Sequence, residues 1–209
     1  SKPTWDIGVT PMPGLLEKAI ADSGFRSKWK GWSTPVSVNG NIQRGIGIAI
    51  HCCRHGYLAN PESAMIFSKP DGTFALNCGS ADVGQGARTV LSLIAAEELG
   101  VGAQDVMMGT MDTSLTQESR SPGGSTVTRG SGTAIILACR DIKESLFKLA
   151  ISAKLINATN PEELETADGN IYLKANPDVK VAIKTVTAQQ NSGSGPLIGR
   201  GFYATKRIN

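Results

Sequence analysis

TFALNCGSADVGQGARTVLSLIAAEELG, residues 73–100, is the stretch from which the fold of the chain can be worked out. Its first eight residues are predicted to form a strand, and Ala87–Leu99 to form a helix that Gly100 ends. Between them lies the first glycine-rich segment, residues 79–86 (GSADVGQG). It opens the helix at the point where the first backbone N–H groups have no partner within the helix.

A second glycine-rich segment, residues 121–132 (SPGGSTVTRGSG), opens the next predicted helix in the same way. At both helix starts, the unpaired N–H groups and the positive end of the macrodipole favour an anion such as a phosphate. Ser125 and Thr126 add hydroxyl donors, and Gln85 offers one acceptor and two donors, which suits the edge of a heterocycle. The glycines that allow a flat or charged ligand to approach the backbone are Gly84, Gly86, Gly123 and Gly124.

A purely structural interpretation stays open for each segment, because glycine-rich turns are common and Ser125 can serve as a helix N-cap. Neither segment is a dinucleotide-binding fingerprint, since no G-x-G-x-x-G follows a strand. Neither is a phosphate-binding loop, since no G-K-[ST] follows the glycines. The presence of two such segments favours a ligand over a flexible turn.

The rest of the chain is predicted to alternate strands and helices. The predicted strands cover residues 45–53 (buried on both faces), 64–68, 105–113 and 196–206, with a hairpin turn at Asp71-Gly72 and two short strands around Asp168-Gly169. The predicted helices cover 13–25, 125–156 and 177–189, and the predicted loops 31–44 and 114–124. The opening of the long helix is rich in poor helix formers, whose small side chains allow another element to pack there: Thr126, Thr128, Gly130, Ser131 and Gly132.

The composition limits the classes of function. The chain has 209 residues, 40% hydrophobic and 19% charged, which suffices for one good-sized domain or two small ones. No run of about 18 apolar residues occurs, so no membrane partner is expected. The net charge is +3, and nothing beside the densest basic patch, residues 26–30 (RSKWK), resembles a nucleic-acid-binding module.

The cysteines and histidines suggest neither a disulfide framework nor a metal site. The four cysteines lack C-x-x-C spacing, so a reducing cytoplasm is the simplest location. On a strand, His51, Cys53 and His55 would share one face, but a zinc site would need a fourth ligand and none is obvious. With only two histidines and no G-x-S-x-G, a hydrolase triad is not expected.

Residues 82–146 resemble the molybdenum-cofactor-binding region of the molybdenum hydroxylases, the xanthine dehydrogenase and aldehyde oxidase family. The family pattern has a G-Q-G that opens a helix ending in A-A-E-x-L-G, then a strand ending in D-T. A loop closing on G-G-S or a similar small triplet follows, and then a long helix. All of these parts occur here in order, as GQGARTVLSLIAAEELG, MDT and GGSTVTRGSG.

The resemblance implies an α+β fold of mixed sheets with packed helices, a two-layer sandwich of the molybdenum-cofactor-binding domain type. Residues 1–209 would form part of that domain, with a core over 45–156 and a smaller C-terminal α/β part over 157–209. The implied ligand is molybdopterin, a pterin dithiolene carrying molybdenum, in bacteria often extended to a cytosine dinucleotide. By position, the cofactor-binding residues would be Val83, Gly84, Gln85 and Gly86 at the pterin, and Gly124, Ser125, Thr126, Val127 and Thr128 as a clasp. Arg129 is a phosphate candidate on charge alone.

The sequence also departs from the family. Family enzymes hydroxylate an aldehyde or an N-heterocycle with oxygen from water, using a glutamate base in a later G-x-G-E-type motif. That motif, the preceding cofactor half and the cysteine-rich cluster motifs are absent from this sequence. We therefore expect no catalytic residue here, and an excised piece or split subunit that binds cofactor only in the complete assembly.

The expected partners are other molybdopterin-domain chains and iron–sulfur or FAD subunits. Without them, an exposed apolar face would favour self-association. Two alternatives remain: a non-catalytic assembly module, and a small anion- or nucleotide-binding protein with coincidental glycines.

Overall fold

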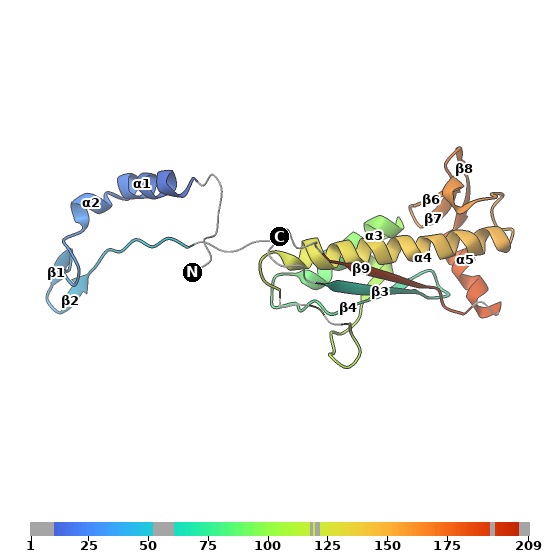
Figure 1. Ribbon diagram of the computed structural model, residues 1–209, viewed down its shortest axis with the longest axis horizontal. Coiled ribbons are helices and arrows are strands. Elements are labelled where there is room, and N and C mark those ends of the chain that lie inside the picture. The colour runs from blue at the N-terminus through green and yellow to red at the C-terminus, as the bar shows by residue number, and fades with distance from the viewer. Residues whose placement is uncertain (1–10, 52–60, 118, 120–121, 193–194, 205–209) are drawn as a thin grey trace, which may run out of the picture. The chain divides into compact units, whose positions relative to one another are not determined.

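The computed structural model describes residues 11–51, 61–117, 119, 122–192 and 195–204 (Figure 1). The chain divides into two compact units, Ser1–Cys53 and Arg54–Asn209. Among the described residues, no helix has the length and apolar composition needed to cross a membrane.

The first unit consists of two helices and a hairpin. α1 (Met12–Ser23) confirms most of the helix predicted over 13–25. It ends at Gly24, whose left-handed conformation (φ 62°) lets its N–H donate to α1 carbonyl oxygens. The other elements are α2 (Phe25–Lys28) and the paired strands β1 (Ser37–Asn39) and β2 (Ile42–Arg44), which lie where a loop was predicted.

The buried strand predicted over 45–53 is wrong for its described part. Residues 45–51 belong to no strand, and all of them are exposed except Ile46, which is partly buried. None of the described residues of the first unit is fully buried, so the apolar side chains of this stretch have no core of that unit to enter. An apolar run predicts a buried strand only where another layer covers it.

The second unit is built on a four-stranded sheet in the order β5-β4-β3-β9. Its strands are β3 (Glu62–Ser68), β4 (Phe74–Cys78), β5 (Val106–Met108) and β9 (Ile198–Tyr203). β3 and β4 form the hairpin predicted at Asp71-Gly72. β5, shorter than predicted, runs parallel to β4 because α3 (Ala87–Leu99) crosses between them, so the sheet is mixed as expected.

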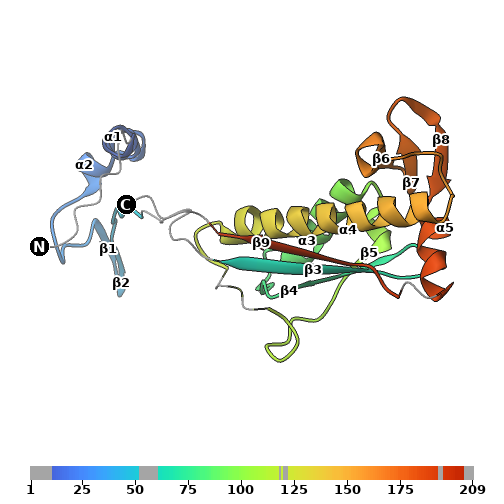
Figure 2. The same ribbon diagram turned by 45° about the vertical axis from the view of Figure 1, so that its right-hand side comes forward.

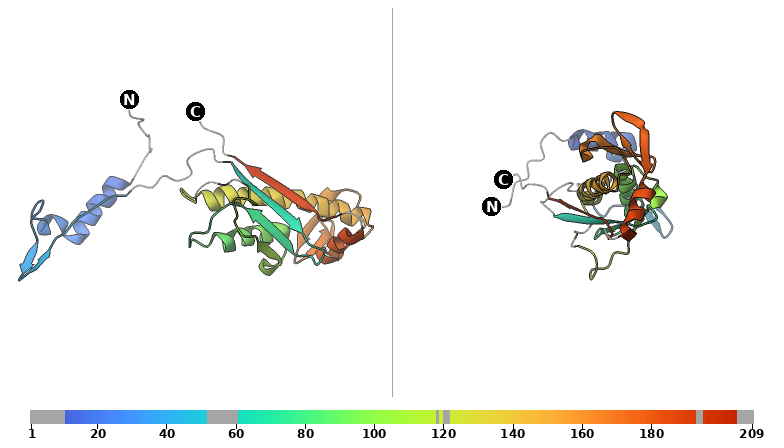
Figure 3. Two further views of the ribbon diagram at one scale, coloured as in Figure 1. Left: turned by 90° about the horizontal axis from the view of Figure 1, so that it is seen from below. Right: turned by 90° about the vertical axis from the view of Figure 1, so that its right-hand side faces the viewer.

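Two helices, α3 and α4 (Gly132–Ser152), pack on one face of this sheet, as Figure 2 and the end-on view of Figure 3 show. Alternate strand residues meet the helices in a core whose largest members include Ile66, Phe74, Leu76, Leu91, Leu99, Ile135, Ile142 and Leu146. Each such side chain contributes about 1.5–3 kcal/mol by burial. The expected two-layer α+β architecture is therefore confirmed. α3 matches its predicted range, whereas the helix predicted over 125–156 begins as a π-helical turn, η2 (Val127–Ser131).

β9 lies against α4 backbone to backbone. A Cβ atom on Gly199 would lie 2.1 Å from the carbonyl oxygen of Ala138. A Cβ atom on Gly201 would lie 1.8 Å from the carbonyl oxygen of Ala134. Two glycines in the closing strand therefore let it pack flat on the long helix.

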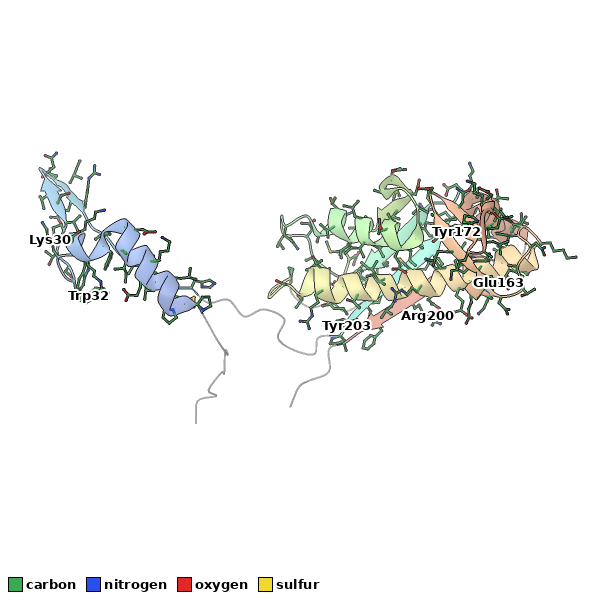
Figure 4. The ribbon with its side chains drawn as sticks, turned by 90° about the horizontal axis from the view of Figure 1, so that it is seen from above. Lys30, Trp32, Glu163, Tyr172, Arg200 and Tyr203 are labelled. Atoms are coloured by element: carbon green, nitrogen blue, oxygen red, sulfur yellow. The ribbon has the colours of Figure 1, made fainter. Side chains whose placement is uncertain are left out.

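A three-stranded antiparallel sheet lies at the C-terminal end of α4, where Figure 4 labels Glu163 and Tyr172. Its strands are β6 (Leu164–Ala167), β7 (Asn170–Leu173) and β8 (Asn176–Ala182), followed by α5 (Ile183–Thr187). The turn predicted at Asp168-Gly169 is confirmed. The helix predicted over 177–189 is wrong in its first half, because Val181 pairs with the buried Ile171 of β7 and draws this stretch into the sheet.

Three 3-10 turns complete the second unit: η1 (Ala103–Asp105), η3 (Pro161–Glu163) and η4 (Ala188–Ser192). The division into a core over 45–156 and a C-terminal part over 157–209 stays a prediction.

Candidate functional site

Asp82 lies in the first glycine-rich segment, which leads into α3, and its side chain binds backbone N–H groups there. Its carboxylate accepts hydrogen bonds from the N–H groups of Gly84 (3.0 Å), Gly86 (3.3 Å) and Arg88 (3.1 Å). The bond from Arg88, followed by that from Gly84, holds the pKa of Asp82 below its usual range. The carboxylate of Asp82 therefore takes one of the N–H groups that the helix start was expected to leave free, that of Arg88, and its charge disfavours an anion there.

Gln85 also bonds within the segment. Its Oε1 accepts from the N–H of Val83 (2.6 Å), and its Nε2 donates to the carbonyl oxygen of Ala81 (2.8 Å). Gly84 and Gly86 are left-handed (φ 102° and 78°), and a Cβ atom on either would meet nothing within 4 Å. The segment therefore presents three groups to open space: its backbone at the glycines, the Gln85 amide, and the side chain of Val83, which is 74% exposed.

The second glycine-rich segment also carries left-handed backbone. Gly124 has φ 61° and Ser125 has φ 60°, a conformation uncommon for a residue with a side chain. The hydroxyl of Thr126 donates to the carbonyl oxygen of Gly123 (2.9 Å) and closes the turn. A Cβ atom on Gly123 would meet nothing within 4 Å, so the space in front of this segment is open as well.

The π-helical turn η2 continues this segment into α4. Val127 is partly buried and packs against the hydrophobic core. Thr128 and Arg129 are exposed. π-helical turns recur at functional sites, and this one brings two predicted site residues to the surface.

A buried cluster of polar side chains joins the two segments. The hydroxyl oxygens of Ser80 and Ser131 are 2.5 Å apart. Ser131 (3.1 Å) and Ser119 (2.5 Å) both donate to Oε2 of Glu62. Ser80, Ser131 and Glu62 are each at most 1% exposed. The Ser80–Ser131 bond therefore links one residue of each glycine-rich segment at the end of the sheet where α3 and α4 begin, while the assignment of residues 83–86 and 124–128 to one site stays a prediction.

Sequence reasoning missed Asp82 and Glu62. An Asp just ahead of a helix start is a recognisable capping signal, so Asp82 could have been found. Glu62 gave no local signal, because its strand was predicted to start at residue 64 and its partners lie 57 and 69 residues away.

The described residues contain no cluster of three or more side chains suited to hold a metal ion. His51 is exposed, and Cys52, Cys53 and His55 lie outside the described residues, so the HCCRH motif stays untested. Burial raises the pKa of the Cys78 thiol, and it raises that of Cys139 to about 12, which leaves neither thiol ionised near neutral pH. The arrangement suits binding through backbone and amide groups.

Known proteins are similar to this chain in sequence and in fold. A family model described as a molybdopterin cofactor-binding domain matches residues 24–209. The probable hypoxanthine oxidase XdhD of Escherichia coli K12 is 29% identical over 175 residues, 83% of this chain and 18% of that protein. The aldehyde oxidoreductase molybdenum-binding subunit PaoC of Escherichia coli O157:H7 is 26% identical over 186 residues, 83% of this chain and 25% of that protein.

The crystal structure of quinoline 2-oxidoreductase from Pseudomonas putida 86 has a similar fold, with a TM-score of 0.59 at 24% identity over 70% of this chain and 19% of that one. This chain thus spans between 18% and 25% of the length of the curated relatives named above. The matched range includes both glycine-rich segments and the helices that they open. The chain belongs to the molybdopterin cofactor-binding domain family of the molybdenum hydroxylases.

Proposed function

We propose that this chain binds a molybdopterin cofactor between its two glycine-rich segments, as one part of the large subunit of a molybdenum hydroxylase. One observation carries the proposal: two open stretches of left-handed backbone lie at the same end of one sheet, joined by the buried Ser80–Ser131 hydrogen bond. Membership of the cofactor-binding family supports the identity of the ligand.

In this arrangement, residues 83–86 present the backbone and the Gln85 amide to the edge of the pterin. Residues 124–128 clasp the cofactor from the other side, with backbone at Val127 and hydroxyl groups at Ser125 and Thr128. The cofactor's phosphate lies toward Arg129 and away from the Asp82 carboxylate, since like charges repel. When bound, the group supplies molybdenum for the hydroxylation of an aldehyde or an N-heterocycle with water. The proposal includes the cytosine dinucleotide form of the cofactor.

Other chains complete the site in this proposal, and the chain alone is not catalytic. The sheet face opposite α4 supports such partners, because Met107, Ile198 and Phe202 are 59%, 42% and 63% exposed there. Phe67 of β3 pairs with Ile198, so this apolar surface crosses strand boundaries. The partners would be other molybdopterin-domain chains and iron–sulfur or FAD subunits, in the cytoplasm. The chain without them should self-associate, which size-exclusion chromatography would reveal.

The test measures molybdenum and pterin in the chain co-expressed with its neighbouring subunits. Gly123→Leu places a side chain in the open space before the second segment, so the complex should form but lose most of its molybdenum and pterin. Gly47→Leu is the matched control, because a Cβ atom there also meets nothing within 4 Å, and it should retain both. A wild-type complex free of molybdenum and pterin would refute the proposal and favour a non-catalytic assembly module.

A further inference from the structure

Glu62 is a buried carboxylate that lies outside both glycine-rich segments. It is the first residue of β3 and is 1% exposed. A buried carboxylate is costly unless hydrogen-bond donors surround it. Its hydrogen-bond donors come from other parts of the chain, so Glu62 links residues that are distant in the sequence.

Two donors to Glu62 come from different parts of the chain. Ser119 lies in the connection between β5 and the second glycine-rich segment, and its hydroxyl donates to Glu62 Oε2 over 2.5 Å. Ser131 lies in η2, and its hydroxyl donates to the same oxygen over 3.1 Å. A serine hydroxyl has one proton, so Ser131 must accept in its 2.5 Å bond with Ser80. With the Ser131 proton on Glu62, Ser80 of the first segment donates to Ser131, and the Ser80 hydroxyl oxygen also lies 3.4 Å from that of Ser119.

The turn η2 packs closely against the side chain of Glu62. A Cβ atom on Gly130 would lie 2.9 Å from Cγ of Glu62, so η2 approaches the carboxylate closely only because residue 130 has no side chain. Ser131, the next residue, is 0% exposed and reaches the carboxylate from the same turn. The small residues at the opening of the long helix thus serve the packing of Glu62.

We propose that Glu62 is a positioning residue that fixes the two glycine-rich segments relative to each other, so that they meet one cofactor as a single site. Glu62 touches no ligand itself and acts through Ser80, Ser119 and Ser131. This inference rests on the proposed function for its cofactor, but the ordering of the segments can be measured without one.

The experiment compares Ser119→Ala and Glu62→Gln with Ser68→Ala in the co-expressed complex. Ser68 is the matched control: it is a buried, hydrogen-bonded serine at the far end of β3, and its partners Gln190 and Leu197 lie away from both segments. The measurements are the thermal melt, amide hydrogen exchange over residues 79–86 and 122–131, and molybdenum and pterin content.

We expect Ser119→Ala, which removes one hydrogen bond to the carboxylate, to raise exchange in both segments by about tenfold. Glu62→Gln keeps an acceptor oxygen but removes the charge that strengthens both bonds, so it should raise exchange in the same segments. The molybdenum and pterin content of both variants should fall. Ser68→Ala should lower the melting temperature by a similar amount but keep the cofactor content, and the amide exchange of both segments, near the wild-type values. Ser119→Thr keeps the hydroxyl and should restore both readouts.

Normal segment exchange in Ser119→Ala and Glu62→Gln would overturn the inference, whatever their melting temperatures. If the wild-type complex holds no molybdopterin, the proposed function fails. The exchange measurement still decides whether Glu62 orders the segments.

Discussion

Replacing Gly201 with alanine tests whether β9 is held against α4 by direct backbone contact. The added Cβ atom would lie 1.8 Å from the carbonyl oxygen of Ala134 and 2.5 Å from the nitrogen of Ala138. A contact distance of about 3.5 Å requires β9 to move by about 1.7 Å relative to α4. Such overpacking costs about 1–3 kcal/mol. The movement also weakens the pairing of β9 with β3, in which each hydrogen bond contributes about 1 kcal/mol.

The second unit should therefore lose about 1–3 kcal/mol of unfolding free energy from overpacking, and about 1 kcal/mol more for each β9–β3 hydrogen bond that breaks. Without the clash, alanine for glycine in a strand would stabilise by about 0.5–1 kcal/mol, so the two accounts predict opposite signs. The assay is guanidinium unfolding followed by circular dichroism, with Gly123→Ala as the control because its added Cβ atom meets nothing within 4 Å. A Gly201→Ala protein as stable as wild type would refute the backbone contact.

Three further changes address the site and the core. Gln85→Ala removes two exposed hydrogen bonds, so the unfolding free energy of the chain should change by less than about 1 kcal/mol, while the assembled complex should lose molybdenum. A large drop in the melting temperature of the chain would instead mean that Gln85 has a structural role. The folded-state pKa of Asp82 is lowered, so its stabilisation is complete above the ordinary carboxyl pKa and lost as pH falls through the lower folded value. Amide exchange at Gly84 and Gly86 should rise over that acidic range in wild type, and Asp82→Asn should abolish this dependence. Burial raises the pKa of Cys139 to about 12, so its thiol should resist alkylation at mildly alkaline pH, and peptide mapping that finds it modified in the native chain would contradict its placement.

The helices and turns that were predicted correctly are those specified by residues close together in the sequence. α3 matches its predicted range because an apolar periodicity ends at Gly100, and the hairpin at Asp71-Gly72 follows from turn propensity. β8 was mistaken for a helix because its placement depends on pairing with β7, which no short window reveals. Residues 45–51 show the opposite error, an apolar pattern without a layer to cover it.

The candidate site also has one part that the sequence predicts and another part that it does not. The two glycine-rich segments could be located because glycine and small polar residues at a helix start are read directly from the sequence. Their proximity could not, because the hydrogen bond that joins them links Ser80 to Ser131, which are 51 residues apart. Contacts at such separation follow from the sheet order, and sequence pattern alone does not set that order.

The internal bonds of the first segment limit what it can bind. Because Asp82 accepts hydrogen bonds from the N–H groups of Gly84, Gly86 and Arg88, an anion at this helix start would lie beside a carboxylate that repels it. Gln85 keeps one N–H and one lone pair after its two bonds within the segment, which matches the edge of a neutral heterocycle. The segment is also folded before it meets a ligand, so binding costs little ordering entropy.

Asp82→Ala should therefore convert the first segment into an anion site. Inorganic phosphate should then slow amide exchange at residues 84–88 in the variant and have no effect there in wild type, because the variant frees three N–H groups and removes the carboxylate that repels phosphate. Phosphate protection of the wild-type segment would show that Asp82 does not exclude anions. In that case the cofactor's phosphate would no longer have to lie toward Arg129.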